Sequence, residues 1–125
     1  MDENRKKDLQ AAGIDVDEAL ERFMNNEALL MKFLLRFPED QNFCRLRQAM
    51  DQSDAAGAFE AAHTLKGVAG NLSLRELFIR ISVLVEDLRA GNLEAAAEKM
   101  PCTEQAYDRI LRTLEQMNGS SDRNG

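Results

Sequence analysis

Hydrophobic residues recur three or four positions apart along most of the chain, and no segment alternates with a period of two. This spacing is typical of amphipathic helices rather than of strands. Four long helices are predicted, over residues 26–51 with a break at Pro38, 53–71, 73–90 and 93–117. Short polar turns join them, which favours antiparallel neighbours. The sequence therefore predicts an all-α fold, an antiparallel up-down four-helix bundle with an extra short N-terminal helix.

The predicted core consists of the apolar side chains on the inward stripe of each helix. In the short N-terminal helix and the first long segment, these are Ala19, Leu20, Phe23, Met24, Leu29, Leu30, Phe33, Leu34, Phe37, Phe43, Leu46 and Met50. In the later helices they are Ala58, Ala61, Ala62, Leu65, Val68, Ala69, Leu72, Leu74, Leu77, Phe78, Ile81, Leu84, Val85, Leu88, Tyr107, Ile110, Leu111 and Leu114.

Polar residues at the helix ends carry capping signals. Asp15 and Glu18 stand in capping-box register at the start of the short N-terminal helix. Either Ser53 or Asp54 is expected to cap the helix over 53–71, since both types favour the position before a helix.

Two prolines and a second capping box divide the long segments. Pro38 is expected to open the second half of the first segment as its first helical residue. Ser73 and Glu76 are expected to form a capping box, and Pro101 to interrupt the last helix, with Thr103 as the new cap.

The chain has 125 residues, which is the size of one domain. Residues 1–12 are predicted to be an N-terminal arm or frayed helix, and residues 13–117 the helical bundle. Residues 118–125 are polar and rich in Gly and Ser, so a disordered tail is expected there.

Composition excludes several classes of function. The net charge of −6 argues against nucleic-acid binding, which needs clustered Lys and Arg. No apolar run is long enough for a membrane span, and the charged N-terminus does not resemble a secretory signal, so a cytoplasmic location is expected. Cys44 and Cys102 are isolated and are predicted to be reduced core thiols. With one histidine, they cannot supply a four-ligand zinc site, and no metal is expected.

His63 is the only histidine in the chain, and helical geometry predicts where it points. At 100° per residue it lies about 160° from Leu65, the centre of the apolar stripe. The imidazole should therefore face outward. The same face carries the small residues Ala56, Gly67 and Gly70, with Phe59, Glu60 and Lys66 at its margins.

These neighbours suit phosphoryl transfer. A neutral imidazole is a nucleophile near pH 7, and Lys66, one turn on, would place a positive charge beside a phosphoryl group on the ring. Gly67 and Gly70 each cost about 1 kcal/mol in a helix, which is explained if a partner protein must approach closely. Glu60 could orient the ring, although its charge would also repel phosphate. The simpler alternative is an ordinary surface histidine, with Gly70 merely ending the helix.

A partner protein would also need apolar contacts around the ring. Phe59 lies about 120° from the centre of the apolar stripe, so it is either exposed for docking or covered by a neighbouring helix. Ile79 and Val83 fall off the main stripe of their helix, so they are either exposed for docking as well or, as we expect, packed against the N-terminal arm.

The stretches His63–Gly67 (HTLKG) and Ala69–Leu72 (AGNL) resemble the signature of histidine-containing phosphotransfer (HPt) domains. The resemblance extends over about residues 13 to 115. It implies a four-helix bundle whose histidine accepts a phosphoryl group from an aspartyl phosphate on a receiver domain and passes it to another receiver. On this chain it makes His63 the phosphorylated residue, at Nε2, Lys66 the cation beside the phosphate, and Gly67 the position that leaves room for the receiver.

The sequence departs from the family pattern at two places. Ser73 and Leu74 stand where many members have Gly-Ala, and Val85 stands where a polar residue is commoner. Val85 falls on the inward stripe of its helix, so we assign it to the core. No polar residue of the helix over 73–90 can be assigned to bond the His63 ring, so the partner that would orient the ring from that helix stays open.

The resemblance also implies which partners and cofactors to expect. Receiver domains and a sensor or hybrid histidine kinase would be the partners of a monomeric phosphoryl carrier that is not itself an enzyme. Magnesium would belong to the receiver, and no cofactor is expected on this chain. One alternative is the phosphoacceptor domain of a chemotaxis-type kinase, disfavoured because the chain lacks an ATP-binding domain, although an excised domain would look identical. The other is a helical adaptor that binds receivers without transferring phosphate.

Overall fold

The computed structural model describes residues 1–124, with side chains described to residue 118. The helices are α1 (Glu3–Ala11), α2 (Val16–Arg22), α3 (Glu27–Arg36), the 3-10 turn η1 (Phe37–Glu39), α4 (Asn42–Asp51), α5 (Ala55–Asn71), α6 (Arg75–Arg89) and α7 (Leu93–Asn124). No strand occurs over residues 1–124, so the all-α prediction is confirmed.

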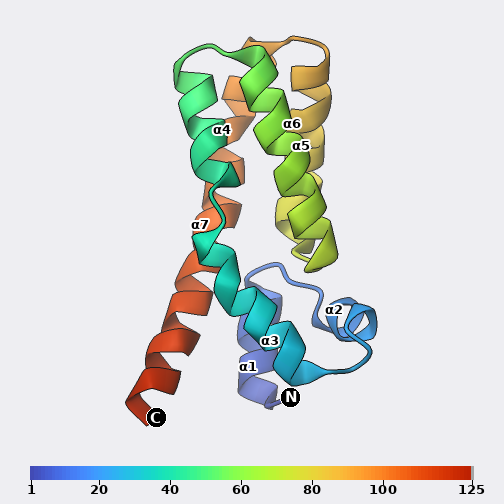
Figure 1. Cartoon of the computed structure of the whole chain (residues 1–125), viewed down its shortest axis with the longest axis vertical. Coiled ribbons are helices and arrows are strands. Elements are labelled where there is room, and N and C mark those ends of the chain that lie inside the picture. Colours follow the sequence, from blue (N-terminus) through green and yellow to red (C-terminus); the bar gives the residue numbers. More distant parts are fainter. Residues whose placement is uncertain (125) are drawn as a thin grey trace.

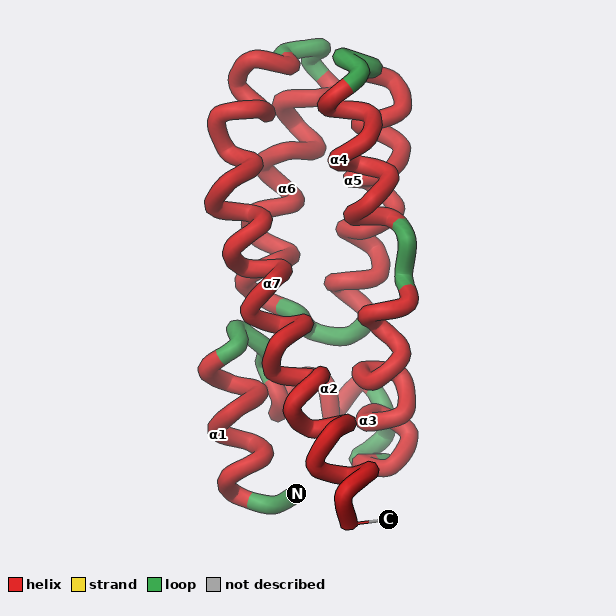
Figure 2. Tube along the Cα trace, turned by 90° about the vertical axis from the view of Figure 1, so that its left-hand side faces the viewer, coloured by secondary structure: helices red, strands yellow, loops and turns green. Residues whose placement is uncertain are grey.

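The helices form an elongated molecule with two halves (Figure 1). In the upper half α4 packs on α5, α5 on α6 and α6 on α7. In the lower half α1 and α3 lie beside the second part of α7, which runs the whole length of the molecule (Figure 2), and α2 contacts α1 and α3. The turn η1 joins α3 to α4 end to end, so Pro38 lies in this turn rather than opening α4.

The inner face of α5 is a stripe of small residues. Ala58, Ala61, Ala62, Leu65 and Ala69 are all buried, as the helical spacing predicts. Alanine side chains let neighbouring helices approach closely, and α5 contacts both α4 and α6. The stripe therefore fixes which side of α5 faces solvent.

An aromatic cluster joins α4 and η1 to α7. Phe43 stacks on Tyr107, with ring centroids 4.1 Å apart and planes 6° apart. Phe37 meets the same tyrosine edge-on at 5.8 Å, and the Arg47 guanidinium lies 4.6 Å from the Phe43 ring centroid. Burial raises the pKa of Tyr107 above its ordinary value, because ionisation would place a charge in this apolar contact.

Helix caps confirm part of the boundary predictions. The Asp15 carboxylate accepts a hydrogen bond from the Glu18 backbone N–H at 3.1 Å, and Asp54 accepts one from Gly57 at 2.9 Å. Asp54 is therefore the cap of α5. The alternative cap, Ser53, instead has φ +54° in the turn before it.

The predicted capping box at Ser73 is wrong. Ser73 lies in the left-handed region with φ +53°, and α6 begins after Leu74, which makes no side-chain capping bond. The Ser73 hydroxyl instead donates a hydrogen bond to Glu18 of α2 at 3.0 Å, and its carbonyl accepts one from the Asp15 N–H at 2.9 Å. The α5–α6 turn is thus tied to the start of α2, a partner 55 residues away in sequence that local spacing does not reveal.

The predicted interruption at Pro101 is also wrong, since α7 continues through it. Proline removes one backbone donor, but the hydrogen bonds on either side can hold the helix. Thr103 is buried inside the helix, and its hydroxyl donates to the Lys99 carbonyl at 2.9 Å instead of capping a new helix.

Three residues expected in the core are exposed. Met24 is 90% exposed, with φ +56° in the turn after α2. Leu29 and Phe33 lie on the outer side of α3, because the buried stripe of that helix runs through Leu30 and Leu34. Leu29 and Phe33 also fit the helical spacing, so the packing of α3 against α2, η1 and α7 decides which of its side chains are covered.

Cys44 and Cys102 are free but exposed, so their assignment to the core is wrong.

In the predicted arm, α1 is a helix that buries Leu9 and Ala12. Within the predicted tail, the backbone of α7 stays helical to Asn124, and residue 125 lies outside the described part. No helix among the described residues is long and apolar enough to cross a membrane.

Ser73 offers a test of the turn that ties α2 to α6. We expect Ser73→Ala to lower the free energy of unfolding by about 1–2 kcal/mol, because alanine keeps the left-handed backbone and loses the bond to Glu18. Ser73→Gly should cost less, because glycine adopts φ +53° without strain. Urea denaturation followed by circular dichroism measures both. Equal losses in the two variants would contradict this account.

Candidate functional site

His63 lies near the middle of α5 with its side chain exposed. Leu65, on the opposite side of the helix, is completely buried. The orientation predicted from helical geometry is therefore confirmed. An exposed imidazole is accessible to another protein, which a ring sealed in the core would not be.

The α5 positions two turns before His63 and one turn after it carry small residues. Ala56 and Gly67 are both exposed. A Cβ atom built on Gly67 would meet nothing within 4 Å, so no contact with the described part of the chain explains the glycine. An approaching backbone could come closer to His63 here than over any larger side chain.

Gly70 has an explanation within the fold. It is half-buried, and a Cβ atom placed on it would lie 3.3 Å from Cε2 of Phe78 on α6. The helix continues to Asn71, so Gly70 is not the residue after its end. The glycine lets α6 approach α5, and a contact with a partner is not needed to account for it.

Lys66 is half-buried on the side of α5 that faces α6. Its Nζ lies 5.9 Å from the Phe78 ring centroid, a cation–π distance. The ammonium group is thus held one turn from His63 by a ring of the neighbouring helix. The site therefore carries a positive charge one turn along α5 from the imidazole.

Phe59 is the aromatic neighbour of the imidazole. The two ring centroids are 5.7 Å apart and the planes are tilted by 31°. Phe59 is half-buried and packs against the edge of the core, so neither full exposure nor full cover describes it. On α6, the guanidinium carbon of Arg89 lies 5.1 Å from the centroid of the same ring.

Arg89 is the residue that the sequence did not reveal. It is the last residue of α6, where a basic side chain is ordinarily explained by the helix dipole. Its contact with Phe59 crosses two helices and joins positions 30 residues apart in the chain, which no local spacing encodes.

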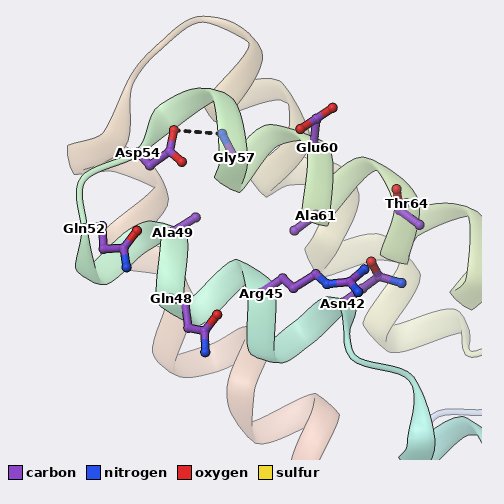
Figure 3. Close-up of a pocket in the computed structure, with 10 residues that line it drawn as sticks. All are labelled: Asn42, Arg45, Gln48, Ala49, Gln52, Asp54, Gly57, Glu60, Ala61 and Thr64. Carbon is purple, nitrogen blue, oxygen red and sulfur yellow. Dashed lines mark hydrogen bonds between the residues drawn. The ribbon is translucent and has the colours of Figure 1, made fainter.

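Glu60 is exposed at the edge of a polar groove between α4 and α5 (Figure 3). The α5 side of this groove includes Glu60 and Thr64, and the α4 side includes Arg45 and Asn42. Figure 3 shows Arg45 extending along the groove while Glu60 points away from α4. The two sides of His63 therefore differ, with aromatic rings and cations toward α6 and a polar groove toward α4.

Ile79 and Val83 are 53% and 44% exposed, so the prediction that they pack against the N-terminal arm is wrong. They line a groove between α6 and α7 together with Cys102. No group of three or more metal-ligating side chains occurs in the described part of the chain.

The model of the Hpt domain family matches residues 28–119. The match runs from the start of α3 into α7 and includes every residue named on the His63 face, whereas α1 and α2 lie outside it. No curated protein and no solved structure matches the chain.

The two glycines near His63 allow a matched stability test. We expect Gly67→Ala to raise the free energy of unfolding by about 0.5–1 kcal/mol, because alanine favours the helix and the added methyl meets open space. Gly70→Ala should gain less or lose stability, because its methyl presses on Phe78. Thermal and urea unfolding of both variants measure the difference, and an equal gain at the two positions would refute the packing explanation for Gly70.

Proposed function

The chain belongs to the Hpt domain family, whose members carry phosphoryl groups on histidine in phosphorelays, and from this premise we propose that His63 is the phosphoacceptor. One observation carries the proposal: the only histidine of the chain is exposed on α5, beside a glycine with open space around it. We propose that the donor and the final acceptor of the phosphoryl group are receiver domains. A sensor or hybrid histidine kinase would supply the phosphoryl group to the donor receiver.

The chemistry is a nucleophilic displacement at phosphorus. Nε2 of neutral His63 attacks the phosphorus of an aspartyl phosphate, the N–P bond forms, and the O–P bond to the aspartate breaks. The aspartate leaves as a carboxylate, and the imidazolium then loses its Nδ1 proton to water. In the second transfer Nδ1 takes up a proton from water, an aspartate oxygen of the next receiver attacks the phosphorus, and the N–P bond breaks as neutral imidazole leaves.

The other residues of the face support these steps by charge and by space. We propose that Lys66 stabilises the phosphoryl oxygens, since its ammonium group is held one turn from the ring. Gly67 and Ala56 leave room for the receiver backbone. Glu60 is exposed at the edge of the groove between α4 and α5, where we propose that it contacts the docked receiver. Gly70 acts through the packing of α6 on α5 rather than by touching the partner.

We propose that the partner supplies the groups that activate the phosphoryl group for transfer. A receiver would bring Mg²⁺ and its own acidic side chains, so this chain acts as co-substrate and needs no cofactor. We further propose that α4 to α7 form an up-down four-helix bundle and that the protein works as a cytoplasmic monomer.

His63→Gln tests the function directly. With a ³²P-labelled receiver, wild type should acquire an acid-labile, alkali-stable label, and the variant should acquire none, because glutamine has no nucleophilic ring nitrogen. Circular dichroism of the variant should match wild type, since the side chain is exposed. Absence of label on wild type across a panel of receivers would overturn the proposal. If those receivers nevertheless bound the chain, the adaptor would be favoured, and labelling only by an ATP-bound kinase domain would favour the chemotaxis-type phosphoacceptor.

Gly67→Gln tests whether the bare surface is needed for docking. We expect it to reduce transfer from the receiver by at least about tenfold, because a long side chain would occupy the space beside His63. Gly67→Ala, which adds one methyl, should reduce it much less. Rates from rapid-quench mixing give the comparison, and unimpaired transfer in Gly67→Gln would show that clearance is not the reason for the glycine.

A further inference from the structure

An aromatic ring, that of Phe59, lies beside the His63 imidazole. Phe59 lies one turn before His63 on α5, with the ring centroids 5.7 Å apart and the planes tilted by 31°. Separations of this size fall within the range of favourable aromatic pairs. The imidazole is exposed to solvent, yet one of its sides is in contact with a ring that packs against the core.

Phe59 is in turn held from the neighbouring helix. The guanidinium carbon of Arg89 lies 5.1 Å from the Phe59 ring centroid, and the Arg89 Nε is 3.3 Å from a carboxylate oxygen of Glu86. The ion pair restrains the guanidinium at the end of α6, and the cation–π contact brings it onto the α5 ring. Arg89, Phe59 and His63 therefore form a continuous row across the two helices.

Val85 and Ser82 of α6 offer the imidazole no free hydrogen-bond donor. Val85 is aliphatic and completely buried. The Ser82 hydroxyl donates its hydrogen bond to the Phe78 carbonyl of its own helix, at 2.7 Å. A partner that bonds a ring nitrogen would fix the tautomer of the histidine, whereas an aromatic neighbour restrains the ring without using either nitrogen.

We propose that Phe59 is a positioning residue for His63 and that Arg89 acts through Phe59. The Phe59 ring limits the rotation of the imidazole while Nε2 stays free for the phosphoryl group and Nδ1 for proton exchange with water. Arg89 limits the motion of Phe59 from α6. This inference rests on the proposed function, because orientation matters only if the ring reacts, and it adds to that function the means by which the nucleophile is held.

The first experiment removes the aromatic ring. Phe59→Leu keeps an apolar side chain, Phe59→Tyr keeps the ring, and Phe33→Leu, on the exposed side of α3, is the matched control. In NMR spectra of the unphosphorylated protein, nuclear Overhauser effects should join the Phe59 and His63 rings, and the His63 ring protons should shift in Phe59→Leu alone. Unchanged His63 resonances in Phe59→Leu would overturn the proposal.

The second measurement separates positioning from docking. At saturating receiver, Phe59→Leu should transfer about 2- to 10-fold more slowly, the range that an aromatic contact supplies, with little change in the half-saturating receiver concentration. Phe59→Tyr should recover most of the rate, and Phe33→Leu should match wild type. A change confined to the half-saturating concentration would identify Phe59 as a docking residue and overturn the proposal.

The third measurement tests whether Arg89 acts through the ring. Arg89→Ala should slow transfer less than Phe59→Leu, and the double variant should be no slower than Phe59→Leu alone. Arg80→Ala is the matched control, because Arg80 lies on the same helix and pairs with Glu76 at 3.6 Å. Effects of Arg89→Ala and Phe59→Leu that multiply would show that Arg89 acts independently of Phe59.

Failure of this inference and failure of the proposed function give different results. If wild type takes no label while the NMR contact is present and depends on Phe59, the phosphoacceptor role is wrong and the ring contact stands. If wild type is labelled and Phe59→Leu reacts at the wild-type rate with unchanged NMR shifts, the function stands and the positioning role is wrong.

Discussion

Burial of the alanine stripe on α5 is the constraint on which the site depends. Ala58, Ala61, Ala62 and Ala69, with Leu65 at the centre, must face α4 and α6, because exposing them would forfeit the apolar contacts that hold the helices together. A helix has one rotation that satisfies this requirement. His63, on the opposite side, is therefore exposed as a consequence of core packing, and its accessibility needs no interaction of its own.

The same close approach shapes the surroundings of the imidazole. Gly70 lets Phe78 of α6 lie against α5, and Lys66 of α5 then rests over that ring. In the opposite direction, Arg89 of α6 lies over Phe59 of α5. Each of the two helices thus places a cation over an aromatic ring of the other helix. As a result, a strongly acidic chain presents positive charge beside its only histidine.

Sequence reasoning succeeded where the signal is local. The helical periodicity, the caps at Asp15 and Asp54 and the direction of His63 each depend on residues within a few positions of one another. It failed where distant segments decide. Ser73 binds Glu18 of α2 instead of capping α6. Leu29 and Phe33, which we expected in the core with Leu30 and Leu34, are exposed on α3, because contacts with remote helices outweigh local preference.

The fold class, the helix that carries His63 and the exposed side of that helix could all be predicted from the amino-acid sequence. Each follows from the 3.6-residue period, which any amphipathic helix must obey when its apolar side chains leave water. Two features of the site depend instead on how the helices pack. Phe59 and Arg89 meet beside the ring, and Gly70 serves helix packing whereas Gly67 faces open space. These are contacts between helices, and their geometry is set by how closely whole helices pack, which the spacing of residues within one helix does not specify.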